Sequence, residues 1–280
     1  MAGPGGTNVR RNTLGFLVAG LAAAGMGGTA QPDDAAAFGH QDWTAVLSRY
    51  VDQQGQVDYE GLHRERAVLD GYLAQIAEAG PESTPELFST AAHELAYYIN
   101  AYNALVFQGV LDGDLDAETV WRGMVPGYGF FVGRKFRLDG RTVNLRKLEN
   151  KIVRARFGDA RVHAALNCAS VGCPRLPATA FEAGRLEREL DSAMMEFVAN
   201  ERHVRVDDAK RTVFLSKIFD WYHDDFLTDE REAGNADPNL IDYVNRFRPE
   251  ASAIPRDYSI RFLEYDKRLN RAAQDLSRLR

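Results

Sequence analysis

The sequence predicts a single α+β domain in which a central buried helix packs on a small, mostly antiparallel sheet. Residues 91–111 predict the helix, because they are apolar on nearly every helical face. Two hairpins predict the sheet: residues 135–143 turn at Asp139-Gly140, and residues 203–215 alternate apolar and polar side chains. The chain has 280 residues, 45% of them hydrophobic, which is enough apolar material for one core.

Helical periodicity predicts the elements that precede the central helix. Residues 42–51 and 64–79 carry apolar side chains at helical spacing, and a Gly-Pro pair ends the second segment. Residues 83–89 are expected to form a short helix with Pro85 in its first turn.

The same patterns continue after the central helix. Residues 112–134 are rich in Gly and aromatic residues and are expected to form an irregular loop over the core. The short apolar run over 162–167 is interpreted as a buried strand. The other expected elements are helices over 145–157, 181–200, 217–226 and 240–247, and a strand over 259–265.

The N-terminus is typical of an export signal. Arg10 and Arg11 precede an apolar run over 14–26, and small residues at 28–30 form a cleavage pattern. The paired arginines resemble a twin-arginine signal, which exports folded proteins. The apolar run is short for a transmembrane span, although an uncleaved membrane anchor is the alternative.

This interpretation divides the chain into a signal peptide over 1–30, a flexible leader over 31–41 and one domain over 42–280. The mature protein is then expected to be periplasmic or secreted, with no stable membrane span after cleavage. An oxidising compartment favours pairing of the two cysteines.

Composition and motifs exclude several function classes. The formal net charge of -6 gives no bulk attraction to nucleic acid, so no nucleic-acid partner is expected. The sequence has no phosphate-binding glycine loop, dinucleotide fingerprint or serine nucleophile elbow, so no cofactor is expected. His163, Cys168 and Cys173 are too sparse for a standard zinc site, so no metal is expected.

Both cysteines, Cys168 and Cys173, lie in one segment rich in Gly and Pro, shortly after His163. A thiol near an imidazole is suited to nucleophilic chemistry. Residues five apart on one strand point to opposite faces, so contact between His163 and Cys168 requires a bend. The alternatives are a small Cys168–Cys173 disulfide and an inert thiol.

The candidate catalytic residues follow from this segment. Cys168 is the candidate nucleophile, His163 the candidate base, and Asn167 or Asn103 the candidate orienting or oxyanion group.

Two asparagines of the central helix belong to the candidate polar network. Asn100 and Asn103 are three apart in the buried helix, hence on one face. Burying an unpartnered amide costs roughly 1–3 kcal/mol, so both require partners. They either hold loop backbone or line a pocket. Glu149 and Tyr222 are candidates for the same pocket, although a solvated face is the default expectation for Glu149 and the expectation for Asp225.

Five blocks of sequence follow one another in a distinctive order. They are Tyr98 to Leu105, Leu148-Glu149-Asn150, His163 to Ser170 with Cys173-Pro174, Leu215 to Phe219 with Trp221-Tyr222 and Asp225-Phe226, and Leu263 to Asp266 with Leu269-Asn270. Taken together, these motifs resemble the family called Domain of Unknown Function 547. Asn150 stands where that family has His, and Lys267-Arg268 stand where it has Trp-Ser. The similarity covers roughly residues 90–270 and includes Asp266 in the closing block, which joins Cys173 in the candidate pocket or polar network.

The chain order also resembles that of papain-like and transglutaminase-like folds, in which a helix precedes a strand with the catalytic His. Here the Cys follows the His instead. This likeness is a fold analogy alone.

These observations predict an exported cysteine-dependent hydrolase or acyl-transferase that acts on an amide or a thioester. The alternative is a non-catalytic exported binding module with a structural Cys168–Cys173 disulfide. In both cases the expected partner is a small-molecule or peptide ligand. Thiol–disulfide exchange is a third hypothesis, which the spacing favours less because it is not Cys-x-x-Cys.

Overall fold

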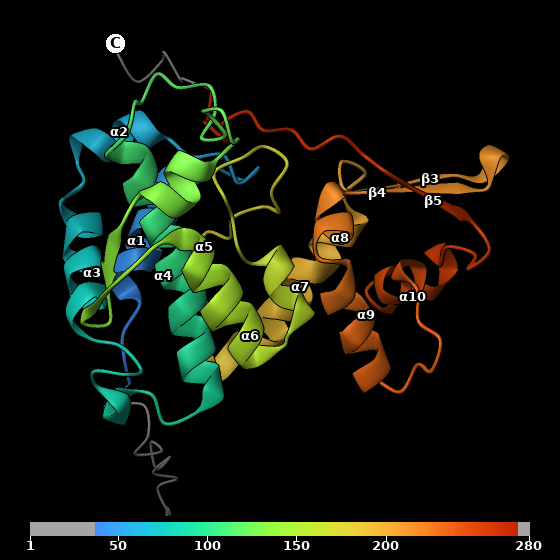
Figure 1. Cartoon of the computed structure of the whole chain (residues 1–280), viewed down its shortest axis with the longest axis horizontal. Helices are drawn as coiled ribbons and strands as arrows, with labels where there is room; N and C mark the ends of the chain where they lie inside the picture. The colour runs from blue at the N-terminus through green and yellow to red at the C-terminus, as the bar shows by residue number, and fades with distance from the viewer. Residues whose placement is uncertain (1–36, 274–280) are drawn as a thin grey trace, which may run out of the picture. The chain divides into compact units, whose positions relative to one another are not determined.

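A computed structural model describes residues 37–273, which form an α+β fold and confirm the predicted class (Figure 1). The predicted signal peptide over 1–30 and the leader residues 31–36 lie outside the described residues. Within the described part, no helix combines the length and the apolar character needed to cross a bilayer.

The central helix forms where the sequence predicts it. It begins after Thr90, whose hydroxyl accepts a hydrogen bond from the His93 N–H and so caps the first turn. The helices up to this point are α1 (Gln41–Tyr50), α2 (Tyr59–Arg64), α3 (Ala67–Glu78), the 3₁₀ turn Pro85–Leu87 and α4 (Ala91–Leu111).

Helix α4 is buried mainly by other helices rather than by a sheet. Its main neighbours are α2, α3, α5 and two short helical segments, and α1, α3 and α4 lie side by side in Figure 1. The expected helix-on-sheet packing is therefore replaced by helix-on-helix packing around α4.

The first predicted hairpin is confirmed. Strands β1 (Phe136–Leu138) and β2 (Arg141–Val143) pair in antiparallel fashion. Asp139 and Gly140 have φ values of 53° and 69°, as a two-residue hairpin turn of this hand requires. The Asp139 carboxylate also accepts from the backbone N–H groups of Glu82 and Ser83, which stabilises its positive φ.

The chain then enters a helical run that contains a π-helical turn. Segment η3 (Leu148–Val153) lies between α5 (Leu145–Lys147) and α6 (Arg154–Phe157). A second π-helical turn, η2 (Gly129–Gly133), lies in the loop after α4. Turns of this kind occur often at functional sites.

The predicted buried strand over 162–167 is wrong. Residues Ala160–Ala164 form a 3₁₀ helix, η4, and the N–H groups of Ala165 and Leu166 both donate to the Val162 carbonyl. The segment is buried, as its composition indicates, but side chains of α4 satisfy the next backbone groups instead of a neighbouring strand.

The C-terminal part forms a second apolar cluster beside a mixed sheet. In this sheet β4 pairs antiparallel with β3 and parallel with β5, and the three strands run together in Figure 1. Helical structure extends beyond the predicted end at residue 226, because α9 continues to Glu232. The elements are the 3₁₀ turn η5 (Ala183–Arg185), α7 (Leu186–Ala199), β3 (Val204–Asp207), the 3₁₀ turn η6 (Asp208–Lys210), β4 (Thr212–Leu215), α8 (Lys217–Trp221), α9 (His223–Glu232), α10 (Leu240–Arg246), the 3₁₀ turn η7 (Glu250–Ser252) and β5 (Ser259–Phe262).

The two asparagines of α4 hold irregular backbone against the helix. The Asn100 side chain donates to the Phe181 carbonyl at 2.8 Å and accepts from the Phe181 N–H at 3.0 Å. The Asn103 side chain donates to the Ala165 carbonyl and accepts from the Asn167 N–H, both at 2.9 Å. Each side-chain amide thus makes the two hydrogen bonds, one to a carbonyl and one from an N–H, that the backbone of a neighbouring strand would otherwise make.

We predict that Asn103→Ala destabilises the protein by about 2–4 kcal/mol, because it leaves a buried carbonyl and a buried N–H without partners. Chemical denaturation with urea measures the change. Gln108→Ala is the matched control, since Gln108 is half-buried on the same helix and its side chain bonds to none of the described residues. A loss below about 1 kcal/mol in Asn103→Ala would contradict the proposed role of this amide.

A second prediction concerns acid stability. Burial lowers the pKa of His40 to about 4 and that of His203 to about 3, from an ordinary value of 6.5. Below pH 6.5 the unfolded chain binds protons that these folded residues do not, so stability falls as the pH drops from 6.5 towards 4.

His203→Leu removes one of these groups at similar volume. Between pH 7 and pH 5, the variant should lose about 2 kcal/mol less unfolding free energy than the natural chain. Urea denaturation at both pH values measures this difference, and equal losses in the two proteins would refute the assignment.

Candidate functional site

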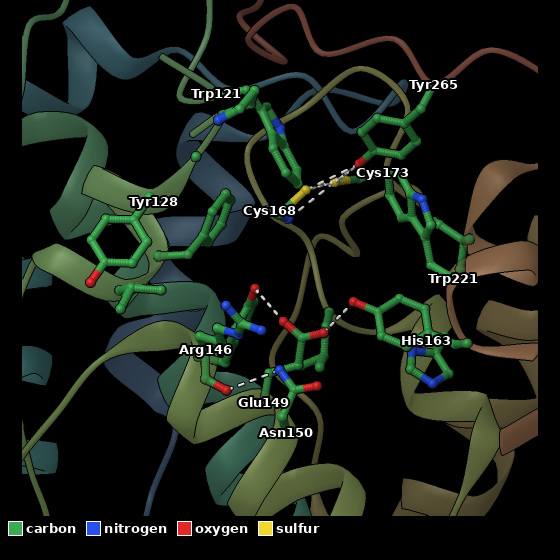
Figure 2. A pocket seen from close by; sticks show the side chains of 18 of the residues that line it. Trp121, Tyr128, Arg146, Glu149, Asn150, His163, Cys168, Cys173, Trp221 and Tyr265 are labelled. Atoms are coloured by element: carbon green, nitrogen blue, oxygen red, sulfur yellow. Dashed lines mark hydrogen bonds between the residues drawn. The ribbon is translucent and has the colours of Figure 1, made fainter. Parts of the chain in front are cut away.

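A cavity of about 330 Å³ brings together residues from α4, the loop after it, η3, η4, the cysteine segment, α8 and the C-terminal segment. Figure 2 shows the cysteines on one wall and Glu149 with Asn150 on the opposite wall. The predicted site residues that line this cavity are Glu149, His163, Cys168, Cys173 and Tyr222.

The cysteine segment is held in a strained turn. Ala169, directly after Cys168, has a φ of 62°, a left-handed conformation that costs a non-glycine residue about 1 kcal/mol or more. The Asn167 side chain stabilises this turn, because its Oδ1 accepts from the Ala169 N–H and its Nδ2 donates to the Pro174 carbonyl, both at 2.9 Å. The turn fixes where the Cys168 sulfur lies.

The two thiols are free and in contact. The Sγ atoms of Cys168 and Cys173 lie 2.9 Å apart. The Tyr265 hydroxyl lies 3.0 Å from the first sulfur and 3.1 Å from the second. The backbone N–H of Cys168 donates to the Cys173 sulfur at 3.0 Å. Cys173 is buried, whereas Cys168 is half-buried and is the more accessible residue of the pair.

These contacts place the first negative charge on Cys173. The pKa of Cys168 is raised well above its usual value, because its thiol bonds to Cys173 and is removed from water. Burial alone would raise the pKa of Cys173, but hydrogen bonds from Cys168, Tyr265 and backbone N–H groups outweigh it and lower that pKa. Burial and the nearby sulfurs raise the pKa of Tyr265, which therefore stays protonated and donates. The pair can act as a thiol beside a thiolate.

Gly172 allows Tyr265 to approach the sulfurs. A Cβ at Gly172 would lie 2.9 Å from the Tyr265 ring, closer than real Cβ contacts, and 3.0 Å from the Asp266 nitrogen. The backbone N–H of Gly172 donates to the Asp266 carbonyl at 2.9 Å. The cysteine segment and the C-terminal segment are therefore joined side by side.

A histidine–carboxylate–arginine chain forms a second cluster. His163 Nε2 lies 2.7 Å from Asp225 Oδ2. Arg154 donates to both oxygens of the same carboxylate, at 2.7 and 2.9 Å. The His163 ring stacks on Tyr222 with ring centroids 3.9 Å apart, and Arg154 lies over Tyr222 at 4.7 Å.

Charge in this cluster is held on Asp225 and Arg154. Burial lowers the pKa of His163, although the Asp225 carboxylate opposes this, so the imidazole is neutral at pH 7. Burial would raise the pKa of Asp225, but hydrogen bonds from His163 and Arg154 hold it well below its usual range. A neutral ring that donates Nε2–H to Asp225 has Nδ1 as its proton acceptor.

Glu149 is bound by two phenols. Its carboxylate accepts hydrogen bonds from the Tyr222 hydroxyl and, at 3.3 Å, from the Tyr102 hydroxyl. Burial and the Glu149 charge raise the pKa of Tyr222, so this hydroxyl stays protonated. Glu149 therefore lies in the pocket rather than on a solvated face.

Aromatic side chains form the remaining walls and part of the rim. Trp121 donates to the Ser170 hydroxyl at 2.8 Å and lies near the Tyr265 ring. Val125, Tyr128 and Trp221 line the cavity and are 63%, 54% and 42% exposed, which makes the entrance apolar.

The structure separates the predicted site residues into two groups. The cavity residues named above come together, but no hydrogen bond joins His163 to Cys168 among the described residues. Asn100, Asn103 and Asn167 bind backbone. The Asp266 side chain pairs with Arg268 away from the cavity. Within residues 37–273, no cluster of three or more His, Cys, Asp or Glu residues is suited to a metal ion.

Three functional candidates escaped the sequence reasoning. Asp225 was expected on a solvated face, but its side chain is 27% exposed and bonds to His163. Arg154 and Tyr265 were not singled out. Asp225 and Tyr265 lie within motifs that resemble the family, and this position was the sequence signal that could have identified them. Arg154 lies in none of these motifs.

Comparison with known proteins agrees with the motif pattern. No curated protein and no solved structure matches the chain. Residues 87–198 match the family described as protein of unknown function, DUF547. This segment includes α4, the η3 turn and both cysteines. Over residues 87–198 the chain is therefore similar to the DUF547 family of proteins of unknown function, as the motifs predict.

Proposed function

We propose that this protein is an exported cysteine-dependent hydrolase or acyl-transferase that acts on an amide or a thioester, with Cys168 as the nucleophile. One observation carries the proposal: the Cys168 sulfur borders a cavity and contacts Cys173, whose pKa is lowered. The export signal over residues 1–30, of twin-arginine type, supports a periplasmic or secreted location.

In the first step, the Cys168 sulfur attacks the carbonyl carbon and its proton passes to the Cys173 thiolate, 2.9 Å away. The C=O electron pair moves to oxygen. When the intermediate collapses, the C–N or C–S bond breaks, the leaving group takes the proton from Cys173, and a thioester remains on Cys168. Tyr265 holds both sulfurs through its hydroxyl.

In the second step, water or an acceptor amine or thiol attacks the thioester. His163 Nδ1 accepts the proton of the attacking group, while Asp225 keeps the ring oriented through Nε2. The C–S bond breaks and the electron pair returns to the Cys168 sulfur. The proton on His163 then passes through water to the Cys168 sulfur, which restores the starting pair of a Cys168 thiol and a Cys173 thiolate. In this mechanism His163 is the base for the attacking water, amine or thiol. The sequence hypothesis made His163 the base for Cys168.

The thiol pair gives the first prediction of this proposal. Iodoacetamide should modify Cys168 with a pH midpoint above that of an ordinary thiol, because its bond to Cys173 raises its pKa. Cys173→Ser should lower this midpoint, because the hydrogen bond and the charge of Cys173 that raise the pKa of Cys168 are lost. Peptide mapping by mass spectrometry, with alkylation before any reductant, measures the site and rate.

His163→Ala is the comparison variant, and its effect on Cys168 alkylation should be smaller than that of Cys173→Ser. An unchanged rate and midpoint in Cys173→Ser would sink the assignment of Cys173 as proton acceptor. Isolation of the natural protein with Cys168 and Cys173 already joined and resistant to mild reduction would sink the catalytic proposal.

A second prediction concerns His163. Asp225→Asn should lower the pKa of His163 further, because the carboxylate that favours the charged ring is gone. Titration of the imidazole signals by NMR measures this pKa. Asp224→Asn is the matched control, since the neighbouring Asp224 side chain is fully exposed. An equal or higher His163 pKa in Asp225→Asn would contradict the proposed pairing.

A binding module without catalysis is the second candidate. The contact between the sulfurs within one loop supports it, because a Cys168–Cys173 disulfide would close the loop without a new approach of chain segments. In that case the apolar entrance and cavity would hold a small-molecule or peptide ligand. The peptide mapping described above separates the two candidates.

A further inference from the structure

Arg146 is a cation on the cavity wall without a partner among the described residues. It lies in α5 (Leu145–Lys147) and lines the cavity, and its guanidinium makes no hydrogen bond or ion pair within residues 37–273. Figure 2 shows it beside Glu149, across the pocket from Cys168 and Cys173.

The backbone of Arg146 is fixed, although its side chain is exposed. Asn144 caps α5, because its side chain accepts from the Lys147 N–H at 2.8 Å. The Asn150 side chain donates to the Arg146 carbonyl at 3.0 Å. The guanidinium is therefore carried by an anchored turn and not by a free loop.

The carboxylate of the cavity, Glu149, already has hydrogen-bond partners other than Arg146. Glu149 accepts from the hydroxyls of Tyr102 and Tyr222, and no ion pair joins it to Arg146 among the described residues. Among the described residues that line the cavity, Glu149 is the one carboxylate and Arg146 is the one guanidinium. A bound anion would complete the hydrogen bonding of Arg146 without displacing an internal partner.

We infer that the cavity binds a ligand with a single negative group, such as a carboxylate, and an apolar or aromatic body. The anion pairs with Arg146, and the body lies against Trp121, Phe131 and Trp221. Only the identity of the reacting atom in this inference rests on the proposed function. If that function holds, the substrate is an anionic amide or thioester whose carbonyl reaches Cys168.

A pair of dyes tests the anion site on the full chain. 8-Anilinonaphthalene-1-sulfonate and N-phenyl-1-naphthylamine share an aromatic body, and the first also carries a sulfonate. Arg146→Gln should weaken binding of the sulfonate dye by about fivefold to tenfold and leave the neutral dye within about twofold. Fluorescence titration measures both dissociation constants.

Lys147→Gln is the matched control, because it removes one positive charge from the same turn outside the cavity lining. It should change neither dye. The inference is overturned if the sulfonate dye binds Arg146→Gln as tightly as the natural chain, if both variants weaken it equally, or if it shows no saturable binding.

A second readout separates this inference from the proposed function. Iodoacetate and iodoacetamide differ by one negative charge, so their rate ratio at Cys168 reports the local cation. Arg146→Gln should lower that ratio by about threefold or more and leave the iodoacetamide rate unchanged. If Cys168 reacts with neither reagent, the proposed function fails, while the dye titration still decides the anion site.

Discussion

The site depends on one constraint, the hydrogen bonding of the Asn103 amide to backbone of the segment that carries His163 and Cys168. The amide binds the Ala165 carbonyl and the Asn167 N–H, and the Asn167 side chain then holds the turn around Ala169. Helix α4 thus positions both the imidazole and the sulfur without a sheet. Because Asn103 and Asn167 are buried, water does not readily replace these hydrogen bonds.

Two polar clusters face one apolar cavity, and each keeps its charge away from the atoms that react in the proposed mechanism. The first negative charge of the thiol pair forms on Cys173, whose pKa is lowered, and the carboxylate charge of Asp225 is matched by Arg154. In the proposed reaction, the more accessible Cys168 is the proton donor and the neutral His163 is the proton acceptor. This distribution would suit a substrate whose reacting carbonyl is neutral, because neither residue beside the carbonyl carries a full charge.

Local chemistry made part of this arrangement predictable. The Asp139-Gly140 turn and the continuous apolar surface of α4 are decided within a few residues, so the sequence was sufficient. The run over 162–167 was ambiguous, because a short apolar segment suits either a strand or a buried helical turn until its partners are known.

The contacts of the candidate site were less accessible to sequence reasoning. Tyr265 is 97 residues from Cys168, and Asp225 is 62 residues from His163. No periodicity reports such distances along the chain. Asp225 follows Asp224 in the sequence, and only the path of α9 decides that one side chain is fully exposed while the other bonds to His163.

The π-helical turn η3 sets the angular relation between Glu149 and Arg154. In this turn the Arg154 N–H bonds to the Glu149 carbonyl, five residues earlier, so the helix contains one residue more than an α-helical turn would. Deleting one residue between them would restore regular α-helix and rotate Glu149 relative to Arg154 by about 100°. Tyr222, which contacts both residues, could then no longer join them. Chain length within this turn is therefore as much a determinant of the site as the identity of its side chains.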